Sequence, residues 1–355
     1  MKLKKKAKLL LVVVLLALFL IGIGVSWMVM TGPVNSNDKN DVEVVIENGS
    51  SSSSIGKLLK DKGLIKSELL FKIYLKLNNV NSLKASTYKF NKSMDLVSII
   101  KVLEKGNSYN PDEVRITFKE GLRITDYAKV IDKNTNNNYD DILLVFKDLD
   151  YTKSLISKYW FLTDSILDSN IYYPLEGYLA PDTYHFKNKD VSVEDIITTM
   201  LDEEEKKLEK YKNSLSSNIH YYMTMASIVE LEGTNSENRK MIAGVFENRL
   251  NSGMNLGSDV TTYYGLQAAM TSDLTTEQFN SSNPYNTRGA GMIGKMPVGP
   301  ICNPSLSSIE ASINPTKSDY LFFVADKHGN IYYTKTNKEH DQKVQEIKDK
   351  GDWIW

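Results

Sequence analysis

A carboxylate lies on the apolar side of a helix predicted at residues 225–233. The positions i, i+3, i+4 and i+7, which share one helical face, are Met225, Ile228, Val229 and Glu232. A carboxylate among apolar side chains is costly unless it is paired, hydrogen-bonded or protonated, and desolvation raises its pKa. Because a carboxyl group that keeps its proton near neutral pH can act as a general acid, Glu232 is a candidate acid.

A second glutamate on the same helix points elsewhere. Glu230 precedes Glu232 by two positions, about 200° around the helix, so the two side chains cannot face the same way. The alternative for Glu232 is a buried structural ion pair, because such pairs also perturb pKa values. Arg249, on the following predicted helix, is a candidate partner. The helix alone leaves open whether Glu232 is a general acid or part of a structural ion pair. Glu230 and Arg249 are expected to be supporting residues of the site around Glu232.

Composition excludes several other kinds of chemistry. The chain has 355 residues, enough for about two domains, and a formal net charge of -1, which gives no electrostatic case for a nucleic-acid partner. The four histidines lack HExxH or comparable spacing and Cys302 is the single cysteine, so neither a metal site nor a cofactor is expected. The sequence also lacks a GxSxG nucleophile elbow, and Cys302 has no evident histidine partner.

The N-terminus predicts a membrane anchor. Five lysines within residues 1–8 precede an uncharged run at 9–30, which is long enough to cross a bilayer core of about 30 Å as a helix. Lysines before the run, with no basic cluster just after it, predict a single pass through the cell membrane, with residues 1–8 in the cytoplasm and the rest of the chain outside. The alternative is a cleaved signal peptide, but its apolar region usually spans about 7–15 residues.

Two α+β regions follow a polar linker at 31–41. Residues 42–107 show the order strand, helix, helix, strand, helix, which predicts a compact module. The serine run at 50–54 lies between the first strand and an apolar-periodic stretch, which favours a loop and helix N-cap over a flexible linker. Residues 108–355 are expected to form a mixed α+β domain that carries Glu232.

Several segments of the second region must position the candidate acid. Two prolines and a glycine within 174–184 exclude a regular helix there, and the pattern Thr234-x-x-Glu237 predicts a capping box at the next helix start. The long loop at 283–304 is dense in Gly, Pro and Asn, so it needs either a function or extensive packing to offset its ordering entropy. Aromatic runs around a Gly-Asn turn predict a hairpin within 320–334.

Long stretches of the chain resemble the MltG/YceG-like endolytic murein transglycosylases. The matching segments are Leu175–Tyr184, Ala226–Glu232, Ile242–Leu250, Gly253–Gly265, Pro284–Thr287, Met296–Pro304, Tyr320–Asp326 and Glu339–His340. The resemblance spans roughly residues 42–347 in the family's order, behind a single N-terminal anchor that the family also has. Two departures are Ala180, where the family often has an aromatic residue, and Ser-Asp-Val-Thr at 258–261, where it commonly has Thr-Asp-Pro-Thr.

The resemblance implies a LysM-like glycan-binding module at 42–107 and a catalytic domain at 108–355. Its acid is the second glutamate of the Ile-Val-Glu-x-Glu segment, which here is Glu232. The implied substrate is the peptidoglycan glycan strand, cut between N-acetylmuramic acid and N-acetylglucosamine. One carboxyl group would protonate the leaving oxygen and then take the proton of the muramic acid 6-hydroxyl. That hydroxyl closes a 1,6-anhydro ring, which would terminate strand elongation.

Three residues are expected to line the cleft, bind sugar and orient the acid: Glu176, Asp259 and Asn286. The alternative for each is loop capping or turn chemistry. Ordinary glycosidases use two carboxylates about 5–5.5 or 6.5–9.5 Å apart. The transglycosylase hypothesis therefore predicts no second carboxylate in nucleophile geometry. The candidates that could contradict it are Glu176, Asp182, Glu230 and Asp259.

The resemblance also implies partners. These are peptidoglycan strands, the membrane through the N-terminal helix, and penicillin-binding proteins with other cell-wall synthesis proteins; no nucleic acid is expected. Three rival functions stay open at this point. They are a hydrolytic muramidase, a non-catalytic glycan-binding scaffold of the cell-wall synthesis machinery, and a cell-division adaptor that binds partners through the loop at 283–304.

Overall fold

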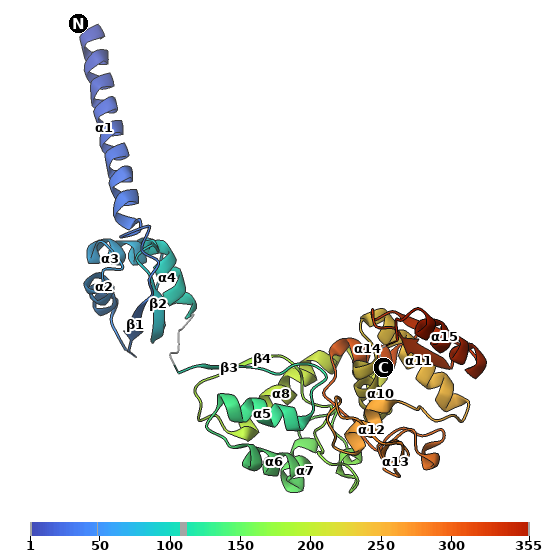
Figure 1. Ribbon diagram of the computed structural model, residues 1–355. Helices are drawn as coiled ribbons and strands as arrows, with labels where there is room; N and C mark the ends of the chain where they lie inside the picture. Colours follow the sequence, from blue (N-terminus) through green and yellow to red (C-terminus); the bar gives the residue numbers. More distant parts are fainter. Residues whose placement is uncertain (1, 48, 107–111, 354–355) are drawn as a thin grey trace. The chain divides into compact units, whose positions relative to one another are not determined.

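The computed structural model describes residues 2–47, 49–106 and 112–353, and the chain divides into two compact units, Met1–Pro111 and Asp112–Trp355 (Figure 1). Both units mix helices and strands, so the predicted α+β class is confirmed. The predicted boundary between module and catalytic domain, at 107–108, lies outside the described residues, as does Met1 of the predicted cytoplasmic tail.

The first unit begins with a long helix, α1 (Lys2–Thr31). Among the described residues, its stretch Val14–Thr31 is the one segment long and apolar enough to cross a membrane. Side chains such as Phe19 and Met28 are exposed, whereas the core helix of a soluble domain would bury them. A signal sequence can have a similar composition, so the membrane anchor and its topology stay predictions.

Five elements follow in the predicted order. They are β1 (Val42–Ile46), α2 (Ser52–Asp61), α3 (Glu68–Leu77), β2 (Ser86–Phe90) and α4 (Leu96–Lys105). The two strands are antiparallel, with Val42 opposite Phe90. The Ser51 hydroxyl accepts a hydrogen bond from the backbone N–H of Ser54 at 3.1 Å, so the serine run caps α2 as predicted. One face of each strand packs on the three helices and forms the core of this module.

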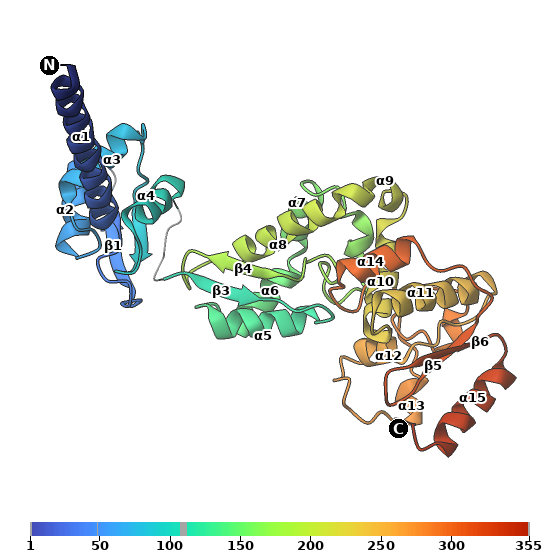
Figure 2. The same ribbon diagram turned by 90° about the horizontal axis from the view of Figure 1, so that it is seen from above.

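The second unit begins with a two-stranded ribbon whose strands are far apart in the sequence. β3 (Val114–Thr117) pairs antiparallel with β4 (Thr183–Phe186), so Thr117 lies opposite Thr183 (Figure 2). Apolar side chains of the ribbon share one core with the helices that separate and follow its strands. These elements are α5 (Ile124–Asn134), α6 (Tyr139–Lys147), α7 (Leu149–Ile156), η1 (Asp164–Leu167), α8 (Val193–Leu208), η2 (Glu209–Tyr211) and α9 (Lys212–Leu215).

The rest of the second unit surrounds a buried helix, α10 (Ile219–Glu232), which carries the candidate acid. Every residue from Met223 to Val229 is buried. Ala226 belongs to the core shared with the ribbon, whereas Met225 belongs to a second core. The prediction of an amphipathic helix is therefore wrong, because α10 separates two cores and contacts apolar side chains on all sides. The remaining elements are α11 (Ser236–Asn251), α12 (Asp259–Gly265), α13 (Thr276–Phe279), η3 (Ala290–Met292), α14 (Leu306–Ile313), β5 (Phe322–Ala325), β6 (Ile331–Thr334) and α15 (Asn337–Asp349).

Two local predictions near the end of α10 have different outcomes. The predicted capping box is wrong, because Asn235 rather than Thr234 is the N-cap of α11. Its side chain accepts a hydrogen bond from the backbone N–H of Asn238 at 2.9 Å, and asparagine is at least as good an N-cap as threonine. The predicted hairpin is confirmed, since β5 and β6 pair antiparallel.

The irregular segment around Gly177 forms no regular helix, as predicted, and packs on the long loop at 283–304. Gly177 has a φ of +87°, and a Cβ atom there would lie 2.3 Å from Cβ of Pro300. The backbone N–H groups of Gly177 and Leu179 donate to Oδ1 of Asn303 at 3.0 and 3.2 Å. The long loop is therefore ordered by close packing against this segment.

Candidate active site

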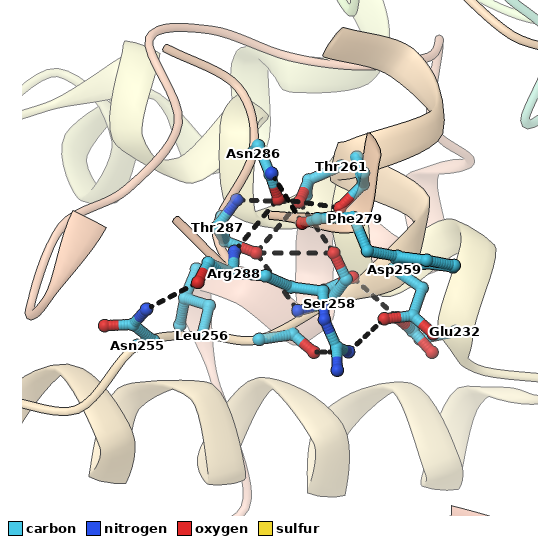
Figure 3. A network of polar contacts seen from close by, with 12 residues as sticks. Glu232, Asn255, Leu256, Ser258, Asp259, Thr261, Phe279, Asn286, Thr287 and Arg288 are labelled. Atoms are coloured by element: carbon cyan, nitrogen blue, oxygen red, sulfur yellow. Dashed lines mark hydrogen bonds and ion pairs between the residues drawn. The ribbon is translucent and has the colours of Figure 1, made fainter. Parts of the chain in front are cut away.

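Glu232 is the last residue of α10 and joins a polar network outside the two cores (Figure 3). Its Oε1 accepts a hydrogen bond from the Ser258 hydroxyl at 2.6 Å. The residue is half-buried, and no described residue donates a hydrogen bond to its Oε2. One oxygen of the carboxyl group is thus held in place, while the other stays free to meet a ligand.

The surroundings raise the pKa of Glu232 above its ordinary value. Burial is the largest cause, because the ionised form loses water, and the negative charge of Asp259 acts in the same direction. The Ser258 hydrogen bond and the positive charge of Arg249 favour the carboxylate and limit the rise. The negative end of the α10 dipole also disfavours a charge at this position. Burial and the Asp259 charge thus favour the protonated form of Glu232, whereas the Ser258 hydroxyl stabilises its ionised form.

Ser258 reaches Glu232 from the start of α12. It is the N-cap of that helix, but its hydroxyl turns to Glu232 and makes no capping hydrogen bond. Its backbone N–H donates to the Thr287 hydroxyl at 3.0 Å, and its carbonyl accepts from the Thr261 hydroxyl at 2.6 Å. The two threonine hydroxyls are 2.8 Å apart, and all three residues are buried. This Ser-Thr cluster (Ser258, Thr261 and Thr287) fixes the hydroxyl that contacts the acid (Figure 3).

Asp259 lies beside the acid on the solvent side. It is the first residue of α12 and forms an ion pair with Arg288, whose guanidinium packs over the Phe279 ring at 5.6 Å from its centroid. Both charged side chains are about half exposed, at 53% for Asp259 and 42% for Arg288. They are therefore accessible to a ligand, and the sugar contact of Asp259 stays a prediction.

Asn286 is completely buried, which argues against its predicted direct contact with sugar. Its Nδ2 donates to the carbonyl oxygens of Phe279 and Ser281 at 2.9 and 2.8 Å. Its Oδ1 accepts from the Thr262 hydroxyl at 2.7 Å and from the backbone N–H of Arg288 at 3.1 Å. Through these bonds Asn286 holds the turn that presents Arg288. The alternative role given for Asn286, a structural residue of a turn, therefore fits better than a sugar contact.

Glu176 is also buried, with an exposed fraction of 1%, and its predicted sugar contact needs the same correction. Its carboxyl group accepts from the backbone N–H of Ile124 at 3.0 Å, from the Tyr264 hydroxyl at 3.1 Å and from Nδ2 of Asn303 at 3.1 Å. Burial raises the pKa of Glu176 to about 8. The residue joins the start of α5 to α12 and to the long loop, so its role is to hold these elements together.

The structural ion pair expected as an alternative for Glu232 is formed by Glu230 instead. Glu230 is 6% exposed in its side chain and pairs with Nη2 of Arg239 at 2.8 Å. It also accepts hydrogen bonds from the Ser305 hydroxyl and backbone N–H at 2.5 and 2.9 Å, and from the Ser308 hydroxyl at 2.6 Å. Glu230 thus connects the end of α10 to α11 and α14.

Arg249 makes no direct ion pair with any described carboxylate. Its Nε donates to the carbonyl oxygen of Leu321 at 2.6 Å, another of its N–H groups donates to the carbonyl of Leu256, and the guanidinium packs over Phe322 at 5.1 Å. Its charge still lowers the pKa of Glu232. Arg249 therefore supports the site through its electrostatic field, and the predicted direct pairing is wrong.

The four carboxylates considered as a second catalytic group all have other partners. Asp182 pairs with Nζ of Lys207 at 3.0 Å, and Glu176, Glu230 and Asp259 are engaged as described above. This arrangement favours chemistry by one carboxyl group. Within the described ranges, no group of three or more His, Cys, Asp or Glu side chains could hold a metal ion.

Three residues that position the acid were not predicted from the sequence, namely Ser258, Thr261 and Thr287. Ser258 and Thr261 were noticed only as part of a departure from the family pattern. Ser258 and Thr287 are 29 positions apart in the chain, so no local spacing relates them.

The fold and the site together define a family. The chain belongs to the YceG-like family, whose model matches residues 44–346, and the resemblance seen in the sequence is confirmed.

Bacterial relatives of this chain carry a more specific name. The chain is 36% identical over 333 residues to the endolytic murein transglycosylase of Streptococcus pneumoniae (strain D39), covering 88% of this chain and 60% of that protein. It is 35% identical over 316 residues to the endolytic murein transglycosylase of Bacillus subtilis (strain 168), covering 87% and 86%. A crystal structure of a yceG-like protein from Listeria monocytogenes superposes with a TM-score of 0.61 at 37% identity, covering 86% of this chain and 99% of that chain.

Proposed function

We propose that this protein is a lytic transglycosylase that cleaves peptidoglycan strands internally, with Glu232 as its single catalytic acid and base. The observation that carries the proposal is the state of that carboxyl group. Glu232 is half-buried with a raised pKa, one oxygen is bound by Ser258, and the other is free. The names of the pneumococcal and Bacillus relatives support the same activity.

The proposed reaction uses the carboxyl group twice. Protonated Glu232 donates its proton to the glycosidic oxygen between N-acetylmuramic acid and N-acetylglucosamine, and the bond from C1 to that oxygen breaks. The carboxylate, now stabilised by the Ser258 hydroxyl, takes the proton of the muramic acid 6-hydroxyl as this oxygen bonds to C1. The product is a 1,6-anhydro end, and no water is consumed.

The two halves of this reaction make opposite demands on Glu232. Burial and the charge of Asp259 favour the protonated form that the first step needs. The Ser258 hydrogen bond favours the ionised form that exists between the two proton transfers. The site meets both demands because the opposing influences act on the same carboxyl group.

The N-terminal unit would decide where the enzyme works. We propose that α1 anchors the chain in the cell membrane, with its N-terminus in the cytoplasm, and that the module at 42–107 binds glycan as a LysM-like domain. Tethering raises the local concentration of strands near the membrane and restricts cleavage to them. Cleavage there would end the elongation of nascent strands, beside penicillin-binding proteins and other synthesis proteins.

Product analysis tests the proposal. Full-length protein in detergent is incubated with purified uncrosslinked glycan, and the released ends are identified by mass spectrometry. The parental protein should release 1,6-anhydro ends, and Glu232→Gln should lose this activity. Glu237→Gln, which changes an exposed glutamate on α11, is the matched control and should retain it. Release of anhydro ends at the parental rate by Glu232→Gln would rule out this residue as the acid.

Hydrolysis is the second candidate, because Asp259 is the exposed carboxylate whose charge acts on Glu232. In a hydrolytic muramidase this carboxylate would activate a water molecule, and the products would carry reducing ends heavier by one water. Reducing ends that disappear in Asp259→Asn would favour hydrolysis over the transglycosylase reaction. A protein that binds glycan but releases neither kind of end would be a scaffold.

A further inference from the structure

A polar groove opens in the second unit, next to the C-terminal end of α10. Its volume is about 470 Å³. The walls come from the end of β3 and the start of β4, and α10 contributes Glu230. The polar residues that line the groove are Thr117, Lys119, Glu120, Asp182, Thr183 and Glu230.

The backbone around the groove is fixed. The hydroxyls of Thr117 and Thr183 lie 2.9 Å apart across the ribbon, and the backbone N–H of Phe118 donates to the carbonyl of Asp182 at 2.9 Å. Gly121 follows with a φ of +73°, and a Cβ atom there would lie 3.5 Å from Leu231 of α10. The groove is therefore built before any ligand arrives, and its Lys119–Glu120 wall rests on the helix that carries the acid.

The charges of the groove are balanced. Asp182 pairs with Lys207 at 3.0 Å and Glu230 pairs with Arg239 at 2.8 Å, so both carboxylates are neutralised inside the protein. Glu120 is exposed and makes no hydrogen bond or ion pair with any described residue. Partial burial of its carboxyl group and the charge of Glu230 raise the pKa of Glu120.

Lys119 is the second charged residue of the groove whose side chain has no partner among the described residues. Its side chain is exposed. Its ammonium group can only donate hydrogen bonds, whereas the adjacent Glu120 carboxylate accepts them. A ligand that suits the pair must both donate and accept and need carry no net charge. Sugar hydroxyl and acetamido groups meet this requirement, whereas an isolated ammonium or guanidinium group would satisfy only the acceptor Glu120.

We propose that this groove is a sugar subsite that holds a part of the glycan strand remote from the cleaved bond, with Glu120 as its recognition residue. The inference rests on the proposed function and extends it to a second contact region. Glu230 and Glu232 are two residues apart on α10 and face opposite sides of the helix, so the groove lies across the end of α10 from the acid. Glu120 binds in this scheme and takes no part in proton transfer.

Binding to an inert protein tests the groove without catalysis. Full-length Glu232→Gln protein is titrated with soluble uncrosslinked glycan strands, once intact and once stripped of stem peptides. Adding Glu120→Gln should weaken binding to both kinds of strand about tenfold, since a neutral amide oxygen accepts a weaker hydrogen bond than a carboxylate. The matched control is Asp132→Asn, an exposed carboxylate on α5 outside the groove, which should bind like the parent.

Kinetics with Glu232 intact give an independent readout. Glu120→Gln should lose kcat/KM mainly through a higher KM, because the lost contact is present in both the ground state and the transition state. A loss confined to kcat would overturn a binding role for Glu120.

The binding outcomes show whether a sugar or a stem peptide occupies the groove, and they test the subsite separately from the proposed transglycosylase reaction. Equal binding by the Glu120→Gln and control proteins would overturn the subsite. Weakening only with intact strands would show that the groove holds the stem peptide and would overturn a sugar subsite. Glu120-dependent binding to stripped strands supports the subsite even where the parental protein releases no anhydro ends, a result that overturns the proposed reaction alone.

Discussion

Replacing Ser258 by alanine isolates the hydrogen bond that holds the candidate acid. The Ser258 hydroxyl donates this bond to Oε1 of Glu232 at 2.6 Å, and Ser258 is buried. A hydrogen bond to a charged group is worth about 1.5–3 kcal/mol. Because this bond favours the carboxylate, its loss should raise the pKa of Glu232 further.

The pH profile should report this change. The proposed first step needs protonated Glu232, so kcat/KM of the parent falls as the pH rises through the pKa of that group. In Ser258→Ala the alkaline fall should move to higher pH, because the hydrogen bond that favours the carboxylate is gone. At the same time kcat should drop about tenfold, because the ionised form between the two steps loses its stabilising donor.

Ser258→Thr is the matched control, because it keeps the hydroxyl and restores the residue that the family commonly has at this position. It should retain both the parental pH profile and most of kcat. The assay is release of anhydro ends from uncrosslinked glycan across the pH range, with urea unfolding of each variant to confirm a folded protein. An alkaline limb that stays in place in Ser258→Ala, with unchanged kcat, would refute the role given to this bond.

Two further predictions concern stability. Arg239→Ala should destabilise the protein by about 3–5 kcal/mol in urea unfolding, because it leaves the buried Glu230 charge unpaired, and a loss below 1 kcal/mol would contradict this. Glu204 of α8 is 3% exposed, and burial raises its pKa from 4.5 to about 8. Its contribution to the stability of the folded protein is therefore fully present below about pH 4.5 and is lost as the pH rises through about 8. The free energy of unfolding should therefore fall across this range by about 1.4 kcal/mol per pH unit for each such group, and Glu204→Gln should flatten the slope; an identical slope in both proteins would exclude Glu204 as a source.

Local sequence was sufficient wherever a short-range pattern dominates. The order of the five elements in the first unit, the serine cap of α2 and the β5–β6 hairpin depend on neighbouring residues, and the structure has all three. The choice of Glu232 also came from helical spacing and the family motif, and the structure gives that residue a free oxygen and a raised pKa. Its catalytic role stays a prediction.

Partners that are distant in the chain could not be predicted in this way. The assignment of Glu176 and Asn286 to the cleft failed because a polar residue in a loop can face either the solvent or the interior. In this protein both are buried by segments more than 20 positions away. The amphipathic pattern of α10 misled for a related reason, since a second core covers the face expected to be polar.

The sequence by itself determined which residues could serve as an acid and which elements form around them, because helix periods, caps and turns are set by near neighbours. Only the tertiary structure decided which carboxylate is neutralised and which stays available. Glu230 meets Arg239 and the serines of α14, whereas Glu232 meets one hydroxyl brought by α12. Burial and electrostatic fields are sums over the surrounding chain, so the protonation of a carboxyl group depends on the packing of elements remote in sequence.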